Sequence, residues 1–283
     1  MALHGEAVTL PADLDAGAVR AVAMDLDRTI LGESLELRPR LIEAVKALPG
    51  AGITPIVATG RMFRSSRPFA LQMGVTAPVI CYQGALIADP VSGEWLRHEP
   101  MLVPLAKEVI RACQAREQHC NVYIDDELYV AELNLYALEY ARHAKLEAHA
   151  VGDLIAWLHQ PTTKIVVVGE PEALDVMQDE LREQFAGRLF IAKSLPFFLE
   201  CAQPGVSKGS ALHWVCERLS IDPAAVVGFG DGANDVELLE EAGYGVAIET
   251  ADAALLRHAR ATVPPPEQDG VAAFLEALVS ARS

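Results

Sequence analysis

The chain has 283 residues, 51% of them hydrophobic, and its 23 Lys and Arg against 39 Asp and Glu give a formal net charge of −16. This length and apolar content predict a folded, globular protein with one large domain or two smaller ones. The negative charge repels nucleic acid and anionic membrane surfaces, so we expect neither as a partner, and an anionic substrate requires a local positive site.

Cysteine usage and the first residues predict a cytoplasmic protein. The five cysteines are odd in number and form no CxxC pair, which suits buried thiols in a reducing compartment. The first twenty residues include Asp13 and Asp15 rather than the basic start and apolar centre of an export signal. Apolar stretches are too short to span a bilayer.

The first part of the chain, from Val19 to about Cys81, alternates strand and helix patterns. We expect strands over 19–24, 53–58 and 79–81 and helices over 40–48 and 62–73. Such alternation predicts parallel βαβ units with right-handed crossovers.

The rhythm changes between about Ala85 and Ala192. Strands over 122–124 and 128–130 are expected to form a hairpin with a solvated acidic turn, Asp125-Asp126-Glu127. A further strand is expected over 164–168, with helices over 105–118, 133–144 and 171–185. This region therefore reads as an α+β insertion.

The last part of the chain returns to the first rhythm. Strands are expected over 225–229 and 244–248, with helices over 208–219, 235–241 and 271–279. Both ends of the chain can then share one sheet, which makes the expected fold class α/β with an inserted α+β domain.

Two carboxylates follow the first buried strand. Asp25 and Asp27 lie one residue apart where the strand gives way to a loop, which is where open α/β sheets bind ligands. Strand residues alternate in direction, so both side chains are expected to point to the same side. Two like charges so close favour a hard divalent cation such as Mg²⁺, which binds carboxylates together with phosphate oxygens.

Two other segments are candidate phosphate sites, each weak when taken alone. Thr59-Gly60-Arg61 follows a strand and precedes a helix, where a hydroxyl and unpaired N–H groups favour an anion. Lys208 begins another helix and supplies a compact positive charge. The alternatives are an ordinary loop with a surface arginine and a solvated lysine.

A second pair of acids follows a buried strand near the C-terminal end. Asp231 and Asp235, with Asn234 between them, lie in a glycine-rich turn after the apolar run 225–227. Acids in this position are unfavourable unless they bind something. The alternative is an Asp- and Asn-rich turn with local side-chain hydrogen bonds.

The same segment admits a dinucleotide-binding interpretation. Gly228-x-Gly230-x-x-Ala233 follows a strand, and Glu249 ends the next strand at about the distance of a ribose-binding acid. Against this, Asp231 places a negative charge where a pyrophosphate must approach the backbone.

The order acid pair, threonine, lysine, acid pair resembles the haloacid dehalogenase superfamily of phosphohydrolases. Its four motifs are matched here by Asp25-x-Asp27-x-Thr29, Thr59, Lys208 and Asp231-x-x-x-Asp235. The surrounding residues are similar to the Cof-type, sugar-phosphatase-like branch, and the insertion fits the C2B cap of that branch. The resemblance covers nearly everything from Val19 onward.

The resemblance implies a Rossmann-like parallel-sheet core over residues 1–84 and 193–283 with an inserted cap over 85–192. It also implies a Mg²⁺-dependent phosphomonoester hydrolase for small phosphorylated metabolites, with sugar phosphates as the first expectation. Asp25 is then the nucleophile that forms an aspartyl-phosphate, and Asp27 is the general acid and base.

Further roles follow from the same resemblance. Mg²⁺ is expected to be held by Asp25, Asp231 and the backbone carbonyl of Asp27, with Asp235 as a direct or indirect ligand. Thr59, Gly60 and Lys208 are expected to bind the phosphoryl group, and Asn234 is expected to orient Asp25 or Lys208.

Three positions depart from the pattern of the branch or stay open. Arg28 replaces a usual glycine, where it could bind a second anionic group of the substrate or be a surface replacement, and we expect an ordinary negative φ there. Arg61 could reach a polar substrate or be solvated. Gln83 replaces a usual asparagine, which weakens the expectation of a substrate contact at that point.

Several functions therefore stay open at the sequence level. A phospho-ligand binding or regulatory protein with little turnover would share the motifs, as would a phosphotransferase or mutase of the same superfamily. The nicotinamide enzyme is the third possibility. We expect a monomer or a small homo-oligomer.

Overall fold

The computed structural model describes residues 9–144 and 146–282, and these fall into two compact units. The first unit contains the chain up to Gly60, Ser66–Leu96 and the chain from Ser207 onward. The second unit contains Arg61–Ser65 and Arg97–Val206.

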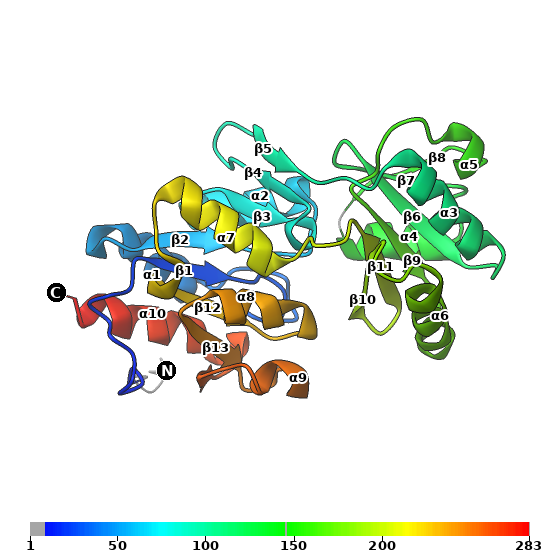
Figure 1. Ribbon diagram of the computed structural model, residues 1–283. Helices are drawn as coiled ribbons and strands as arrows, with labels where there is room; N and C mark the ends of the chain where they lie inside the picture. The colour runs from blue at the N-terminus through cyan, green and yellow to red at the C-terminus, as the bar shows by residue number, and fades with distance from the viewer. Residues whose placement is uncertain (1–8, 145, 283) are drawn as a thin grey trace. The chain divides into compact units, whose positions relative to one another are not determined.

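The first unit is built on a parallel sheet with the strand order β14-β13-β12-β1-β2 (Figure 1). In chain order these strands are β1 (Ala21–Met24), β2 (Thr54–Val57), β12 (Val226–Gly230), β13 (Tyr244–Ile248) and β14 (Ala261–Val263). Strands β1, β12 and β13 are buried along their whole length, as expected for a parallel sheet that is covered on both faces.

Helices cover both faces of this sheet. The helices and 3-10 turns are α1 (Pro39–Ala47), η1 (Leu48–Ala51), α2 (Phe63–Gln72), α7 (Lys208–Leu219), η3 (Pro223–Ala225), η4 (Ala233–Asp235), α8 (Val236–Glu241), α9 (Ala253–Leu256), η5 (Pro266–Gln268) and α10 (Gly270–Ser280). Side chains of α7 and α8 share a core with Ala21, Ala23 and Ile56 of the sheet. On the other face Phe274 of α10 meets Phe229 of β12 edge-to-face. The unit is thus a three-layer α/β/α domain.

A small antiparallel sheet follows α2. It has the order β3-β4-β5, made by β3 (Val79–Cys81), β4 (Leu86–Ala88) and β5 (Trp95–His98), and the turn η2 (Tyr82–Gly84) joins β3 to β4. A parallel bridge between Ala58 and Ile80 links this sheet to the end of β2.

The second unit is a mixed sheet with helices. The strand order is β10-β11-β9-β6-β7-β8, and every pair is antiparallel except β7 with β8. Its elements are α3 (Val103–Gln114), β6 (His119–Ile124), β7 (Glu127–Val130), α4 (Leu135–Ala144), β8 (Ala148–Ala150), α5 (Leu154–Trp157), β9 (Lys164–Val168), α6 (Pro171–Gln184), β10 (Phe190–Leu195) and β11 (Phe198–Ala202). Helices α3 and α6 share one core with the alternate residues of β6, β9 and β11.

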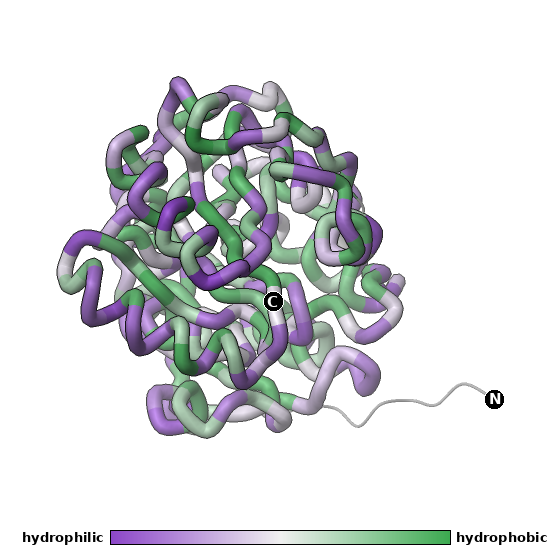
Figure 2. Tube along the Cα trace, turned by 90° about the vertical axis from the view of Figure 1, so that its right-hand side faces the viewer, coloured by the Kyte–Doolittle hydropathy of each residue, from purple (hydrophilic) through white to green (hydrophobic). Residues whose placement is uncertain are grey.

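Apolar and polar stretches alternate along the chain trace in Figure 2, as expected where buried elements are joined by polar loops. All five cysteines are buried free thiols, as the sequence predicted. Among the described residues no helix combines the length and the apolar character needed to cross a membrane.

The predicted fold class, a parallel-sheet α/β core with an inserted α+β part, is confirmed. The division between the parts differs from the predicted one. The units separate after Leu96 and after Val206 rather than after residues 84 and 192. The reason is strand pairing, since β4 pairs with β3, whereas β10 and β11 extend the sheet of the second unit through β9.

The acidic turn between β6 and β7 is not the solvated tip that the sequence predicted. Asp126 is only 6% exposed, and its carboxylate accepts hydrogen bonds from the backbone N–H groups of Phe63 and Arg64. The charge pattern of three neighbouring acids could not reveal this, because the partners lie about sixty residues earlier in the chain.

Candidate active site

The carboxyl ends of three adjacent strands bring the predicted motifs together in the first unit. Met24 of β1 is in register with Phe229 of β12 on one side and with Val57 of β2 on the other. Asp25, Asp231 and Thr59 follow these strand ends within two residues. The parallel register alone therefore places the motifs at one edge of the sheet.

Lys208 joins two of the carboxylates. Ser207 caps helix α7 by accepting a hydrogen bond from the backbone N–H of Ser210 at 3.1 Å, so the helix begins at Lys208. The Lys208 Nζ lies 2.5 Å from Asp25 Oδ1 and 2.6 Å from Asp235 Oδ1, and the lysine side chain is fully buried. Gly209 lets the start of α7 pack closely against α8, because a Cβ there would collide with the Glu237 carbonyl.

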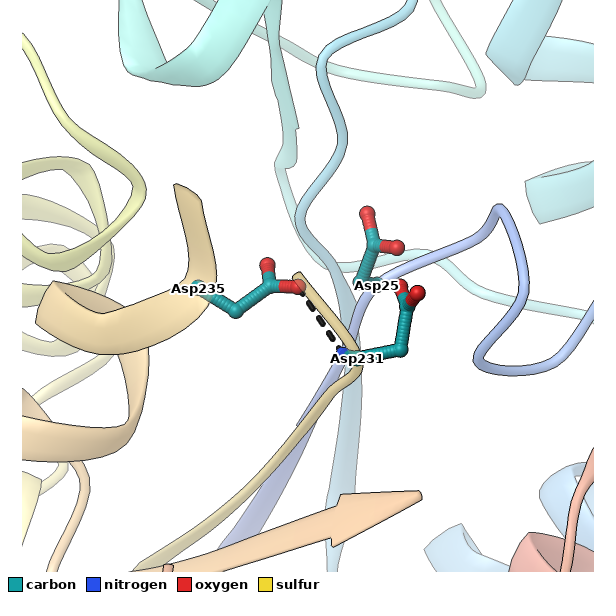
Figure 3. Close-up of side chains that lie close together, drawn as sticks. All are labelled: Asp25, Asp231 and Asp235. Carbon is teal, nitrogen blue, oxygen red and sulfur yellow. Dashed lines mark hydrogen bonds between the residues drawn. The ribbon is translucent and has the colours of Figure 1, made fainter. Parts of the chain in front are cut away.

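The second acid pair is held by its own backbone. Asp235 Oδ2 accepts hydrogen bonds from the backbone N–H groups of Asp231 and Gly232, each at 3.1 Å. Figure 3 shows the side chains of Asp25, Asp231 and Asp235 gathered around the end of the strands. One carboxylate oxygen from each of the three lies within 4.8 Å of the others.

Thr29 and Arg28 complete the surroundings of Asp231. The Thr29 hydroxyl lies 3.3 Å from Asp231 Oδ1 and 3.4 Å from Asp25 Oδ2, within reach of either carboxylate. Arg28 Nε lies 2.8 Å from Asp231 Oδ2. Arg28 is 57% exposed in its side chain, so the pair closes one side of a buried carboxylate from the surface.

The backbone of Arg28 contradicts the sequence-based prediction. Its φ is 59°, in the left-handed region, instead of an ordinary negative value. A tight loop imposes this angle, because Leu31 N–H donates to the Leu26 carbonyl while Arg28 N–H donates to the Leu31 carbonyl. The conformation that glycine adopts easily is therefore kept here by an arginine.

The titration of the cluster reflects its excess negative charge. Burial raises the pKa of Asp25 well above its ordinary value, although Lys208 opposes the shift. Burial and the charge of Asp235 raise the pKa of Asp231 to about 7 against Arg28 and Lys208. Burial disfavours the Lys208 charge, but Asp235 and Asp25 outweigh it and raise the lysine pKa. A proton or a cation would neutralise the remaining charge.

The donor set fits a hard divalent cation. Three buried carboxylates with oxygens this close provide the oxygen ligands that Mg²⁺ prefers, and they are otherwise costly to bury. The side chain of Asp27 is not one of the three. Asp27 is half-buried and forms an isolated bridge with Leu31.

Thr59 and Gly60 lie against a residue that the sequence did not single out as a site residue. The Thr59 carbonyl accepts a hydrogen bond from the Gln83 backbone N–H, and a Cβ on Gly60 would lie 2.5 Å from Gln83 Nε2. Gln83 Oε1 in turn accepts from Asn234 Nδ2 at 3.1 Å. The sequence-based prediction was that Asn234 orients Asp25 or Lys208. In the structure its amide donates instead to Gln83.

Gln83 has a conspicuous backbone. Tyr82, Gln83 and Gly84 have φ values of 51°, 59° and 103°, so two residues other than glycine are held in the left-handed region in succession. Strain of this kind persists only where the surroundings impose it, and it is typical of functional sites. From the sequence only Gly84 gave a signal of a special turn.

The start of helix α2 differs from the predicted anion site. Its first N–H groups, those of Phe63 and Arg64, are taken by the Asp126 carboxylate. Arg61 belongs to the second unit together with this segment. The phosphate-binding groups that the sequence predicted in the first unit are thus Thr59, Gly60 and Lys208, without the helix N-terminus.

Comparison with known families agrees with this geometry. Residues 22–275 match the model of the Hydrolase_3 family, described as haloacid dehalogenase-like hydrolase. This match spans most of the chain, including all four motifs.

Named relatives are phosphatases. The chain is 26% identical over 260 residues to the 5-amino-6-(5-phospho-D-ribitylamino)uracil phosphatase YitU of Bacillus subtilis, covering 90% of this chain and 96% of YitU. It is 28% identical over 270 residues to the pyridoxal phosphate phosphatase YbhA of Escherichia coli, covering 90% and 97%. Among solved structures, TM0651 from Thermotoga maritima superposes with a TM-score of 0.81 at 30% identity, covering 91% and 97%.

Proposed function

The chain belongs to the haloacid dehalogenase-like hydrolases and is a phosphatase of that superfamily, and from this we propose that it hydrolyses monoesters of small phosphorylated metabolites through an aspartyl-phosphate on Asp25. The observation that carries the proposal is the buried group of Asp25, Asp231, Asp235 and Lys208 at the ends of β1 and β12. Burying three carboxylates beside one lysine that pairs with only two of them has no purely structural advantage.

We propose Mg²⁺ as the cofactor, held by Asp25 and Asp231 with Asp235 as a further or indirect ligand and with the Asp27 carbonyl contributing. When bound, the ion supplies positive charge between an anionic nucleophile and an anionic phosphate. The excess negative charge of the three carboxylates supports this assignment.

In the first half-reaction an Asp25 carboxylate oxygen attacks the phosphorus of the monoester. The new bond joins this oxygen to phosphorus, while the bond between phosphorus and the leaving oxygen breaks. Asp27 gives its proton to the leaving oxygen, so the alcohol departs neutral. Lys208 Nζ, held at Asp25 Oδ1, lowers the charge repulsion that the approaching phosphoryl group meets.

In the second half-reaction water attacks the same phosphorus. Asp27, now ionised, accepts a proton from the water, and the bond between phosphorus and the Asp25 oxygen breaks to release inorganic phosphate. Thr59 and Gly60 are proposed to bind the phosphoryl oxygens with the Thr59 hydroxyl and the loop backbone in both steps.

The second unit is proposed to act as the cap that selects the leaving group. It is inserted between the second and third motifs and includes Arg61, directly after the proposed phosphate loop. Sugar phosphates are our first candidates. The phosphates for which YitU and YbhA are named carry a nitrogen heterocycle, so phosphates of this class are the second candidates to test.

A substrate screen tests the proposal. The purified full chain is incubated with sugar phosphates, pyridoxal phosphate, nucleotides and phosphoglycolate, with Mg²⁺ and then with EDTA. We expect Mg²⁺-dependent release of inorganic phosphate from at least one compound. Binding of these compounds without release would favour a regulatory protein, and transfer to an added sugar acceptor would favour a phosphotransferase or mutase.

A further inference from the structure

A buried carboxylate in the turn between β6 and β7 has no part in the proposed chemistry. Asp126 Oδ1 accepts a hydrogen bond from the Phe63 N–H at 3.0 Å, and Asp126 Oδ2 accepts one from the Arg64 N–H at 2.6 Å. The Arg64 guanidinium also forms an ion pair with the neighbouring Glu127. The turn thus holds the first residues of α2 by backbone and by side chain.

This contact caps the start of helix α2. The first N–H groups of a helix have no partner within the helix, and they carry the positive end of its dipole. One carboxylate that accepts from two successive N–H groups satisfies both donors and fixes the direction of the first turn. Here the carboxylate comes from a distant hairpin rather than from the residue before the helix.

The backbone of this turn is that of a tight hairpin. Asp125 and Asp126 have φ values of 53° and 60°, the left-handed conformations of a tight hairpin turn. Asp125 is exposed and accepts from Gln160 Nε2 at 3.0 Å, whereas Asp126 is buried. Asp125 and Asp126 therefore share backbone conformation and charge, but only Asp126 accepts hydrogen bonds from the start of α2.

The anchored amides lie next to the proposed phosphate loop along the chain. Only Arg61 and Met62 separate Gly60 from Phe63, so Gly60 stays within about 11 Å of the anchored N–H group. Arg61–Ser65 packs with the second unit, while Thr59 and Gly60 pack with the first. Gly60 and the anchored N–H group of Phe63 are therefore close along the chain, although they belong to different units.

We propose that Asp126 is a positioning residue for the phosphate loop: by accepting the first two N–H groups of α2, it sets the conformation of Arg61–Ser65 and thereby the positions of Thr59 and Gly60. This inference rests on the proposed function of that loop. The inserted unit would then position the phosphate loop in addition to selecting the leaving group.

Two isosteric variants in one turn test the proposal. Asp126→Asn replaces one acceptor oxygen by a donor that faces an N–H group, and Asp125→Asn is the matched control, since asparagine tolerates the left-handed region. For both we measure the Kd of inorganic phosphate by calorimetry with Mg²⁺, then KM and kcat on the best substrate, and the urea midpoint. Phosphate binding requires no turnover, so it tests Asp126 even if no substrate is hydrolysed.

We expect Asp126→Asn to raise the phosphate Kd and KM about tenfold, the size of one lost charge-assisted hydrogen bond, with a smaller change in kcat. Asp125→Asn should stay within about twofold of wild type. A phosphate Kd and KM unchanged in Asp126→Asn would overturn the proposal, including the case in which only the urea midpoint falls. If Asp126→Asn does not fold, Asp126→Gly and Asp125→Gly form a second matched pair, because glycine takes the same φ without strain.

Discussion

At the residue scale, Arg28 shows how an ion pair and a strained backbone coexist beside a charged cluster. The guanidinium of Arg28 neutralises part of the negative charge of Asp231, and it opposes the rise in the pKa of that carboxyl. The backbone of Arg28 is strained, because its φ of 59° lies in the left-handed region. Substitutions at this position can separate the contribution of the side chain to stability from that of the backbone.

Replacement of Arg28 by glycine and by alanine isolates the backbone contribution, because both variants lose the ion pair equally. Only alanine keeps a Cβ that disfavours the left-handed region. We expect Arg28→Gly to be more stable than Arg28→Ala by about 1 kcal/mol in urea unfolding. Equal stabilities would show that the loop relaxes to a negative φ.

Gly60 is a second residue whose identity follows from one contact. A Cβ there would lie 2.5 Å from Gln83 Nε2, and Gln83 is fixed by its bond to Asn234. The Gln83 amide has to move away from such a Cβ, so we expect Gly60→Ala to lower the free energy of unfolding by about 1 kcal/mol, the size of the lost hydrogen bond to Asn234, and to reduce kcat/KM. In a Gln83→Ala background the clash is absent, so Gly60→Ala should then lower the free energy of unfolding less than it does in wild type.

The control for Gly60→Ala is Gly50→Ala, since a Cβ at Gly50 meets nothing within 4 Å. Unfolding of both variants by urea measures the difference. A stability of Gly60→Ala equal to that of Gly50→Ala would argue against the contact with Gln83.

The sequence predicted the residues that gather at the site but not all of their partners. Asp25, Asp231, Asp235 and Lys208 were predictable because each follows a strand or begins a helix, and a parallel register aligns those ends. The contacts of Gln83 and the φ of Arg28 were not predictable, because residues far along the chain and the closure of a loop impose them.

At the element scale, the sheet of the second unit holds a buried ion pair between neighbouring strands. Lys164 of β9 and Glu200 of β11 lie 3.0 Å apart, with side chains 4% and 8% exposed. Removing one partner leaves a buried charge without its counterion, whereas removing both leaves an apolar pair.

This asymmetry gives a stability prediction. Glu200→Leu should lower the free energy of unfolding by about 3–5 kcal/mol, and the double variant Lys164→Met with Glu200→Leu should recover most of that loss. Urea unfolding of wild type, both single variants and the double variant measures the coupling. A double variant no better than Glu200→Leu would contradict the account.

Strand β6 carries a histidine that links stability to pH. Asn134 Nδ2 lies 3.2 Å from His119 Nδ1, so that nitrogen accepts, and Nε2–H donates to Asn121 Oδ1 at 2.9 Å. Burial lowers the His119 pKa below its ordinary value of 6.5, although the bond to Asn121 opposes the shift. The unfolded chain therefore takes up the proton first as the pH falls.

His119 should thus contribute full stability above about pH 6.5 and lose it as the pH falls toward the lowered pKa. His119→Gln keeps a donor for Asn121 but does not titrate. We expect its free energy of unfolding to fall less than that of wild type between about pH 7.5 and about pH 5.5. The free energy of unfolding of the exposed control His159→Gln should fall as much as that of wild type. Equal losses in all three proteins would refute the role of His119 in the pH dependence.

Many elements were predictable from periodicity, but several short ones were not predicted: strands β4, β5, β8, β10, β11 and β14 and helices α5 and α9. Helix α7 and strands β9 and β13 have the predicted bounds, because an apolar pattern and a clear start or stop signal coincide there. The acidic turn at Asp126 was misjudged because local charge suggests solvation, while a helix start elsewhere in the chain supplies its partners.

At the scale of the whole molecule, one chain builds an α/β unit with a charged cluster and a second unit inserted between two of its motifs. The family match covers residues 22–275 and so includes most of both units, and the named relatives are phosphatases. We propose Asp25 as the nucleophile of a phosphomonoesterase, with the other charged residues arranged around it.

The rate of phosphate release by Asp25→Asn is the sharpest test of this role of Asp25. The change is isosteric, so the fold should remain, and Asp179→Asn on the exposed face of α6 serves as the control. With Mg²⁺ and the best substrate, we expect Asp25→Asn to lose about four orders of magnitude or more in kcat while Asp179→Asn matches wild type. Turnover by folded Asp25→Asn within about tenfold of wild type would contradict the account.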